Sequence, residues 1–145
     1  MLALCCAARA TETAALTTVL YDKMAVIGCG LIGSSLARAA RAHGAVTSIV
    51  VGDPSAQVRE RVVALGLADE VCGDLAHAVE GADLVVLATP VGVMAEVAAA
   101  IAPHLKPGAT LTDVGSVKGA IAQAFLKAAP AVVFAVAGHP IAGTE

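Results

Sequence analysis

The sequence predicts an α/β fold in which a parallel sheet of about six strands is doubly wound, with helices on both faces. Short apolar runs alternate with helical segments from Met24 onward, which is the pattern of strands joined by crossover helices. The expected strands carry few charges, as parallel strands buried on both faces do. Apolar residues make up 58% of the chain and aromatic residues only 2%, so Ala, Val, Leu and Ile must build the core.

Each expected strand is short and runs into a turn or the start of a helix. The first enters a glycine-rich turn, and the fourth, the best candidate for a central strand, ends at Pro90. The third is the weakest, and the sixth is read as a buried strand. The expected strands are residues 24–27, 48–51, 70–72, 84–88, 110–113 and 132–137.

Five helices are expected between these strands. The first two end at Gly44 and Gly66, and glycine favours the position after a helix; Ser55 is suited to cap the start of the second. A short third helix covers residues 75–80, and Pro130 closes the fifth. The fourth has one apolar face, formed by residues three or four positions apart: Met94, Val97, Ile101 and Leu105.

At 145 residues the chain is long enough for one domain with a sizeable core. Residues 1–22 lack the alternating pattern and are expected to form a loose N-terminal extension, leaving residues 23–145 as the domain. The extension faintly resembles a signal peptide but has no basic start, so a cytoplasmic location is expected.

Composition excludes several classes of function. The net charge is −3 and the basic residues are scattered, so nucleic acid is not an expected partner. The apolar stretches are interrupted before they reach the length of a membrane-spanning helix. The four cysteines have neither the spacing of a zinc site nor that of a disulfide framework, so no metal is expected.

The loop after the first strand reads Gly28-Cys29-Gly30-Leu31-Ile32-Gly33, a G-x-G-x-x-G sequence between an expected strand and helix. This is the context of the dinucleotide-binding fingerprint of Rossmann-type folds. Gly28 allows the tight turn, Gly30 lets the backbone approach a pyrophosphate, and Gly33 lets helix and strand pack closely. The N–H groups of Leu31 and Ile32 would then face the phosphates.

An acid at the end of the second strand completes the fingerprint. Asp53 lies 20 residues after Gly33, where a carboxylate accepts hydrogen bonds from the adenosine ribose; the alternative is a turn-forming Asp before Pro54. A 2′-phosphate would meet like charge and no arginine follows immediately, so NAD is favoured over NADP. Thr89 and Pro90 end the fourth strand and are either cofactor contacts or simply a strand end.

Three segments together resemble one family. "VIGCGLIGSSLARAAR", "LTDVGSVKGAI" and "GHPIAGTE" are similar to the cofactor domain of the prephenate and arogenate dehydrogenases of tyrosine biosynthesis. The resemblance covers nearly all of residues 24–145. It implies an NAD-dependent oxidative decarboxylation in which hydride passes to nicotinamide, the substrate hydroxyl loses a proton and carbon dioxide departs.

The resemblance also assigns roles to residues of the later loops. His139 matches the catalytic base, and Ser116 matches a serine near the reacting hydroxyl, although it could equally cap the following helix. Lys118 could attract the dicarboxylate substrate or could be a solvated lysine. Thr144 and Glu145 match the substrate-side loop.

The resemblance also implies a helical second domain, which forms the homodimer of the family and closes over the substrate, and no segment of residues 1–145 is expected to form it. The chain alone is therefore expected to bind NAD with little turnover. Two alternatives are another NAD-linked oxidoreductase of the β-hydroxyacid dehydrogenase type and a stand-alone NAD-binding module.

Overall fold

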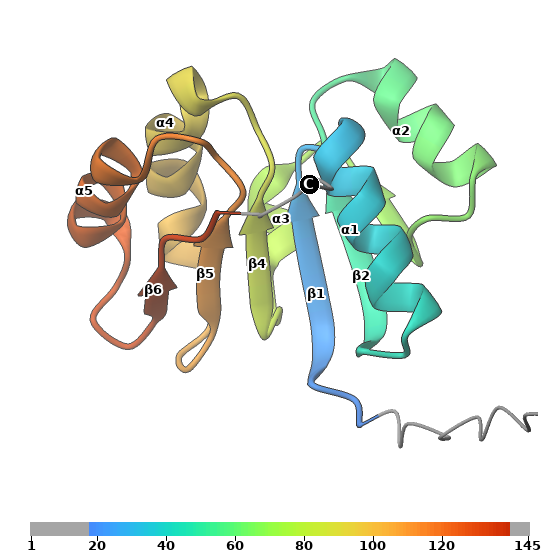
Figure 1. Ribbon diagram of the computed structural model, residues 1–145, viewed down its shortest axis with the longest axis horizontal. Coiled ribbons are helices and arrows are strands. Elements are labelled where there is room, and N and C mark those ends of the chain that lie inside the picture. The colour runs from blue at the N-terminus through green and yellow to red at the C-terminus, as the bar shows by residue number, and fades with distance from the viewer. Residues whose placement is uncertain (1–17, 140–145) are drawn as a thin grey trace, which may run out of the picture.

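The computed structural model describes residues 18–139. Its six strands form one parallel sheet in the order β3-β2-β1-β4-β5-β6, the Rossmann order, which confirms the predicted fold class (Figure 1). The strands are β1 (Tyr21–Ile27), β2 (Val46–Gly52), β3 (Glu70–Cys72), β4 (Leu84–Leu87), β5 (Thr110–Asp113) and β6 (Phe134–Val136). The helices are α1 (Leu31–Ala42), α2 (Ala56–Ala64), α3 (Leu75–Val79), α4 (Val91–Ile101) and α5 (Lys118–Ala128), with a 3-10 turn at Ala102–His104.

Two separate apolar cores lie on the two faces of the sheet. Side chains alternate along a strand, so Met24 and Val26 of β1 enter one core while Ala25 and Ile27 enter the other. The first core packs against α1 and α2, and the second against α3, α4 and α5. In Figure 1, α1 lies in front of the sheet and α3 behind it.

The helix ends follow the local sequence. Gly44 and Gly66 have φ values of 58° and 60°, so both adopt the left-handed conformation that commonly ends a helix. The Ser55 hydroxyl accepts a hydrogen bond from the Val58 amide at 3.4 Å, which confirms the predicted cap. The fourth helix differs from expectation, because α4 ends at Ile101 and Leu105 lies beyond the 3-10 turn. Pro103, within that turn, has no N–H to continue the α-helix.

The first strand begins at Tyr21, three residues before the predicted start at Met24. Tyr21 pairs with Val46 and Lys23 with Ser48, so backbone pairing with β2 continues beyond the apolar run. Polar residues can occupy this end of the strand because burial begins only at Met24 and continues to Ile27, the carboxyl end of β1.

The prediction that β6 is buried was wrong. Phe134 is 66% exposed and Val136 is 53% exposed, because β6 is the edge strand and pairs only with β5. Val133, just before it, lies in the core, and Ala137, just after it, is partly buried against the same core.

The amino ends of the strands are joined by two aspartates. The Asp83 carboxylate accepts hydrogen bonds from the Lys23 amide at 2.9 Å and from the Lys106 ammonium. The Asp69 carboxylate accepts one from the Ile49 amide at 2.7 Å and pairs with Arg41. These contacts lower the pKa of both carboxyls, through Lys106 above all at Asp83 and through the Ile49 amide above all at Asp69.

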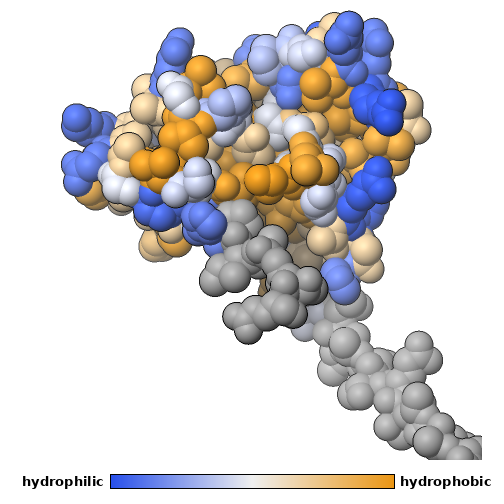
Figure 2. All heavy atoms as spheres, turned by 45° about the horizontal axis from the view of Figure 1, so that its top comes forward, coloured by the Kyte–Doolittle hydropathy of each residue, from blue (hydrophilic) through white to orange (hydrophobic). Residues whose placement is uncertain are grey.

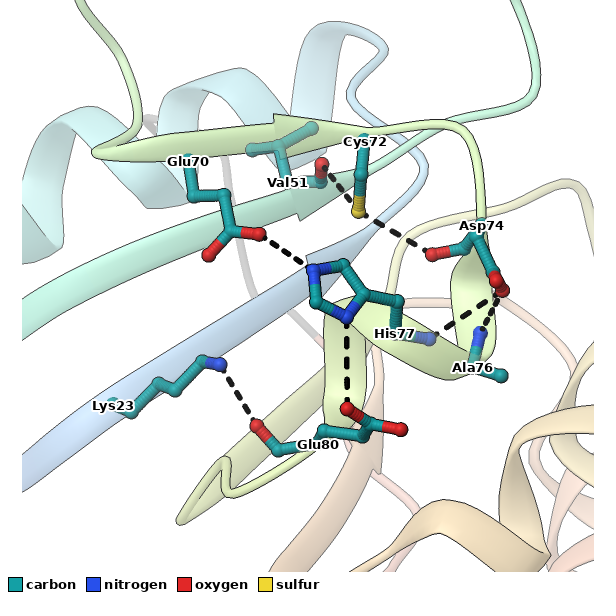
Figure 3. A network of polar contacts seen from close by, with 8 residues as sticks. All are labelled: Lys23, Val51, Glu70, Cys72, Asp74, Ala76, His77 and Glu80. Carbon is teal, nitrogen blue, oxygen red and sulfur yellow. Dashed lines mark hydrogen bonds and ion pairs between the residues drawn. The ribbon is translucent and has the colours of Figure 1, made fainter.

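A polar network surrounds α3 (Figure 3). Asp74 caps the helix by accepting from the Ala76 and His77 amides. His77 lies between two carboxylates, 2.9 Å from Glu70 and 3.5 Å from Glu80. The network therefore links β3 to α3 and has a structural role. Within residues 18–139, no helix has the length and hydrophobicity needed to span a membrane.

Candidate functional site

A crevice of about 860 Å³ opens at the carboxyl ends of β1, β2 and β4, where ligands bind in open α/β sheets. Hydrophobic residues gather in the middle of this end of the molecule, with hydrophilic ones toward its margins (Figure 2). The crevice is lined by Gly28, Gly30, Leu31, Ile32, Asp53, Pro54, Val58, Leu75, Ala88, Thr89, Pro90, Val93, Glu96, Val97 and Ala100. It therefore collects every predicted cofactor residue except Gly33.

The three glycines of the loop lie in different surroundings. Gly28 has a φ of 87°, a conformation that side chains disfavour. A Cβ on Gly33 would lie 2.3 Å from the Gly28 carbonyl oxygen, whereas one on Gly30 would meet no atom within 4 Å. Gly33 thus seats the helix against the loop, and Gly30 leaves open space at the crevice.

The start of α1 offers backbone donors to an anion. Gly30 is the N-cap residue, no side chain within the described residues caps the helix, and its first turn contains no acid. Leu31 and Ile32 are exposed at the crevice. Helix N-termini of this kind bind phosphate groups through their free N–H groups and the helix dipole.

Asp53 is 8% exposed, and backbone donors fix its carboxylate. Oδ2 accepts from the Cys29 amide at 3.0 Å, and Oδ1 accepts from the Ser55 amide at 2.9 Å. Each carboxylate oxygen has two lone pairs, so both can still accept a hydroxyl. Burial, together with the nearby Asp53 charge, raises the pKa of the Cys29 thiol, which therefore stays protonated beside this acid at neutral pH.

Arg59 lies next to the turn formed by Asp53 and Pro54, a contact that the sequence did not predict. Arg59 donates from Nη1 to the carbonyl oxygens of Asp53 and Pro54, both at 2.8 Å. It lines a separate hollow on the outer side of α2 and β3 and not the crevice. Arg59 therefore braces the turn, and the charge facing the crevice at this point is that of Asp53.

Thr89 and Pro90 begin the opposite wall of the crevice. The Thr89 hydroxyl oxygen is buried and has no hydrogen-bond partner within the described residues, which is uncommon for a buried polar atom. Beyond it, the wall is mostly apolar, formed by Leu75, Val97 and Ala100 among others, and Glu96 is the acid on it. This surface suits a flat ring, while the glycine loop and Asp53 suit phosphates and ribose hydroxyls. The residues present therefore fit a dinucleotide.

The predicted catalytic residues lie on neighbouring loops at the same edge of the sheet. Ser116 follows β5 and His139 follows β6; both are exposed, and neither lines the crevice. The prediction that Ser116 could cap the helix was wrong, because α5 begins one residue later with Val117 as its N-cap. Thr144 and Glu145 lie outside the described residues.

Lys118 is not the solvated lysine considered above. Its ammonium donates to the Asp113 carboxylate and to the Gly138 carbonyl oxygen, and its side chain is 32% exposed. Asp113 was not among the predicted site residues. The signal that could have found it is its place at the end of a buried strand, within the segment "LTDVGSVKGAI". Its side chain is fully buried and joins the loops that carry Ser116 and His139.

Comparison with known families identifies this arrangement. Residues 36–145 match the model of the family described as the prephenate dehydrogenase nucleotide-binding domain, which is more than half of the chain. The chain belongs to this family.

Individual relatives agree with the assignment. The chain is 44% identical over 125 residues to a cyclohexadienyl dehydrogenase of Zymomonas mobilis, covering 86% of this chain and 42% of that protein. It is 30% identical, with a TM-score of 0.74, to a crystal structure of prephenate dehydrogenase from A. aeolicus in complex with hydroxyphenyl propionate and NAD+, covering 86% of this chain and 43% of that one. It is 36% identical, with a TM-score of 0.74, to Synechocystis arogenate dehydrogenase, covering 84% and 42%.

The chain thus spans about two fifths of the length of these relatives. The part that it spans corresponds to their nucleotide-binding domain.

Proposed function

We propose that this nucleotide-binding domain binds NAD in the crevice and takes part in the NAD-dependent oxidative decarboxylation of prephenate, arogenate or both in tyrosine biosynthesis. The observation that carries the proposal is the Asp53 carboxylate, which is fixed on the Cys29 amide of the glycine loop and opens into the crevice. Family membership and the NAD+ held by the A. aeolicus relative support it.

Different residues of the crevice bind different parts of the cofactor. The N–H groups at the start of α1 hold the pyrophosphate, with Gly30 allowing its close approach and Leu31 and Ile32 at its side. Asp53 accepts the ribose hydroxyls, and its charge repels the 2′-phosphate of NADP, since Arg59 is turned to carbonyl oxygens. Thr89 and Pro90 contact the cofactor where it crosses the sheet.

His139 takes the proton of the substrate hydroxyl on a ring nitrogen, since histidine is the side chain that most often serves as a general base. NAD, when bound, supplies the chemistry of accepting hydride. Ser116 orients the hydroxyl from the neighbouring loop. Lys118 holds the loop, since its ammonium is already shared by two acceptors, and Thr144 and Glu145 are assigned to the substrate side.

The substrate, the oligomeric state and the cellular location are proposed from the family resemblance. The substrate is a small cyclohexadienyl dicarboxylate or its amino counterpart, the complete enzyme is a homodimer, and its location is the cytoplasm. Gel filtration tests the homodimer, assays with both substrates test the substrate class, and cell fractionation tests the location.

Cofactor choice tests the proposed site. Calorimetry should show one NAD site per chain and weaker binding of NADP. Asp53→Asn removes the negative charge with little change of shape and should shift the NADP to NAD affinity ratio toward NADP about tenfold or more, since 1.4 kcal/mol corresponds to a tenfold change. Glu96→Gln, at another acid lining the crevice, is the matched control and should keep the NAD preference. Tighter NADP binding by the unaltered protein would refute the preference.

The chemical role is tested separately, by NADH formation with prephenate and with arogenate. His139→Asn should abolish any turnover while NAD affinity stays unchanged. A variant that oxidises either substrate at the original rate would exclude His139 as the base.

A further inference from the structure

Asp113 is a buried acid at the carboxyl end of β5, and the proposed chemistry does not use it directly. It is 2% exposed as a residue, and three donors surround its carboxylate. Oδ2 accepts from the Gly115 amide at 2.7 Å and from the Lys118 ammonium, and Oδ1 accepts from the Gly138 amide at 3.1 Å. A buried carboxylate needs partners of this kind, and here they come from three segments of the chain.

The contacts converge on Gly138, the residue before His139. Its N–H donates to Asp113 and its carbonyl oxygen accepts from Lys118, so both of its backbone polar groups are held by one ion pair. A Cβ at this position would lie 2.8 Å from the Asp113 carbonyl oxygen and 2.9 Å from the Thr112 hydroxyl oxygen. The loop after β6 is therefore pressed against the end of β5, and only glycine fits there without a shift.

The chain that leaves β6 needs this attachment because β6 lies at the edge of the sheet. β6 pairs with β5 alone and its three residues are exposed, so packing does little to fix the chain that leaves it. Consecutive Cα atoms are about 3.8 Å apart, so fixing the Gly138 peptide sets where the His139 side chain starts.

We propose that Asp113 and Lys118 are positioning residues: their ion pair holds the Gly138 peptide and so places His139 at the carboxyl edge of the sheet, the edge at which the dinucleotide crevice opens. The proposal rests on the proposed function for the role of His139. The attachment of Gly138 itself does not depend on that role.

Amide hydrogen exchange of Gly138, measured by NMR on the whole chain, tests the attachment. Asp113→Asn and Lys118→Met should each speed Gly138 exchange by about tenfold to a hundredfold, the range expected when a buried polar partner is lost. The double variant should exceed the larger single effect only slightly, because both residues act through one pair. Lys127→Met, at an exposed lysine in the last turn of α5, is the matched control and should leave Gly138 unchanged.

Thermal unfolding of each variant separates local release from loss of the fold. If Asp113→Asn unfolds, Lys118→Met decides, because it removes the ammonium and leaves the Asp113 carboxylate on the two backbone amides. Unchanged Gly138 exchange in a folded Lys118→Met protein, or in a folded Asp113→Asn protein, would overturn the proposal.

The position of His139 is followed through its ring resonances on addition of NAD. In the unaltered protein NAD should shift both the His139 ring signals and the Gly30 amide signal. In the two variants the Gly30 shift should persist while the His139 shift is lost, a result that general destabilisation would not produce. A His139 shift of full size in both variants overturns the placement of His139.

If NAD shifts no resonance in the unaltered protein, the proposed cofactor function fails, and Gly138 exchange still decides whether the ion pair holds the loop.

Discussion

The glycines around the site show how single residues divide structural and binding roles. Gly33 is close-packed, since a Cβ there would overlap the Gly28 carbonyl oxygen, while Gly30 faces open space. Gly138 resembles Gly33 in being confined by backbone, although it lies in a loop far along the sequence. The fingerprint distinguishes Gly30 from Gly33 by their positions, whereas the confinement of Gly138 is seen only in its surroundings.

Two alanine substitutions separate these roles. Gly33→Ala should lower the free energy of unfolding by about 2 kcal/mol or more, the cost of forcing extra volume into a packed position. Gly30→Ala should change it by less than about 1 kcal/mol but weaken NAD binding about tenfold or more by blocking the approach of the pyrophosphate. Chemical denaturation and calorimetry measure the two quantities. Equal loss of stability in both variants would contradict this assignment.

At the scale of elements, polar anchors at both ends of the strands hold the sheet in register. Asp83 joins the amino ends of β1 and β4 through the Lys23 amide. Asp53 joins the glycine loop to the turn after β2, and Asp113 joins the loops after β5 and β6. Each of these aspartates accepts a backbone N–H from another segment, so hydrogen bonds help to fix these ends of the strands.

The Asp83 anchor predicts acid sensitivity. Lys106 and the Lys23 amide hold the pKa of Asp83 below its ordinary value of 3.8. The stabilisation is therefore complete above pH 3.8 and is lost as the pH falls through the lower pKa of the folded state. Asp83→Asn should cost about 1 kcal/mol near neutral pH and should flatten the fall in stability in acid.

Urea unfolding at several pH values measures this effect. Glu60→Gln, at an exposed acid of α2, is the control and should leave the profile unchanged. An unaltered acid profile in Asp83→Asn would show that this anchor is not responsible.

At the scale of the whole molecule, the two halves of the sheet are covered unequally. Helices cover β1 on both faces, whereas β6 is exposed. The crevice lies over the well-covered half, and Ser116 and His139 lie over the other. The cofactor crevice is thus built on the better-covered part of the fold.

Ligand binding should stabilise the whole domain. NAD at one hundred times its dissociation constant should add about 2.7 kcal/mol, which raises the melting temperature of a domain of this size by about 10 °C. Gly30→Ala, with its tenfold weaker binding, should show at most about half of this rise at the same NAD concentration, since the added stability falls to about 1.4 kcal/mol. An equal rise in both proteins would place NAD outside the glycine-loop crevice.

The sequence by itself determined the order of strands and helices, because apolar periodicity, glycines and caps act over a few residues. It also determined the glycine loop with its acid, since their spacing is set by one strand and one helix. It did not determine the exposure of β6, which depends on strand order, nor the Lys118 contacts with Asp113 and Gly138, which join residues up to 20 positions apart. The tertiary structure decided these features. The partners of the buried Asp113 carboxylate depend on how distant segments meet at the end of the sheet.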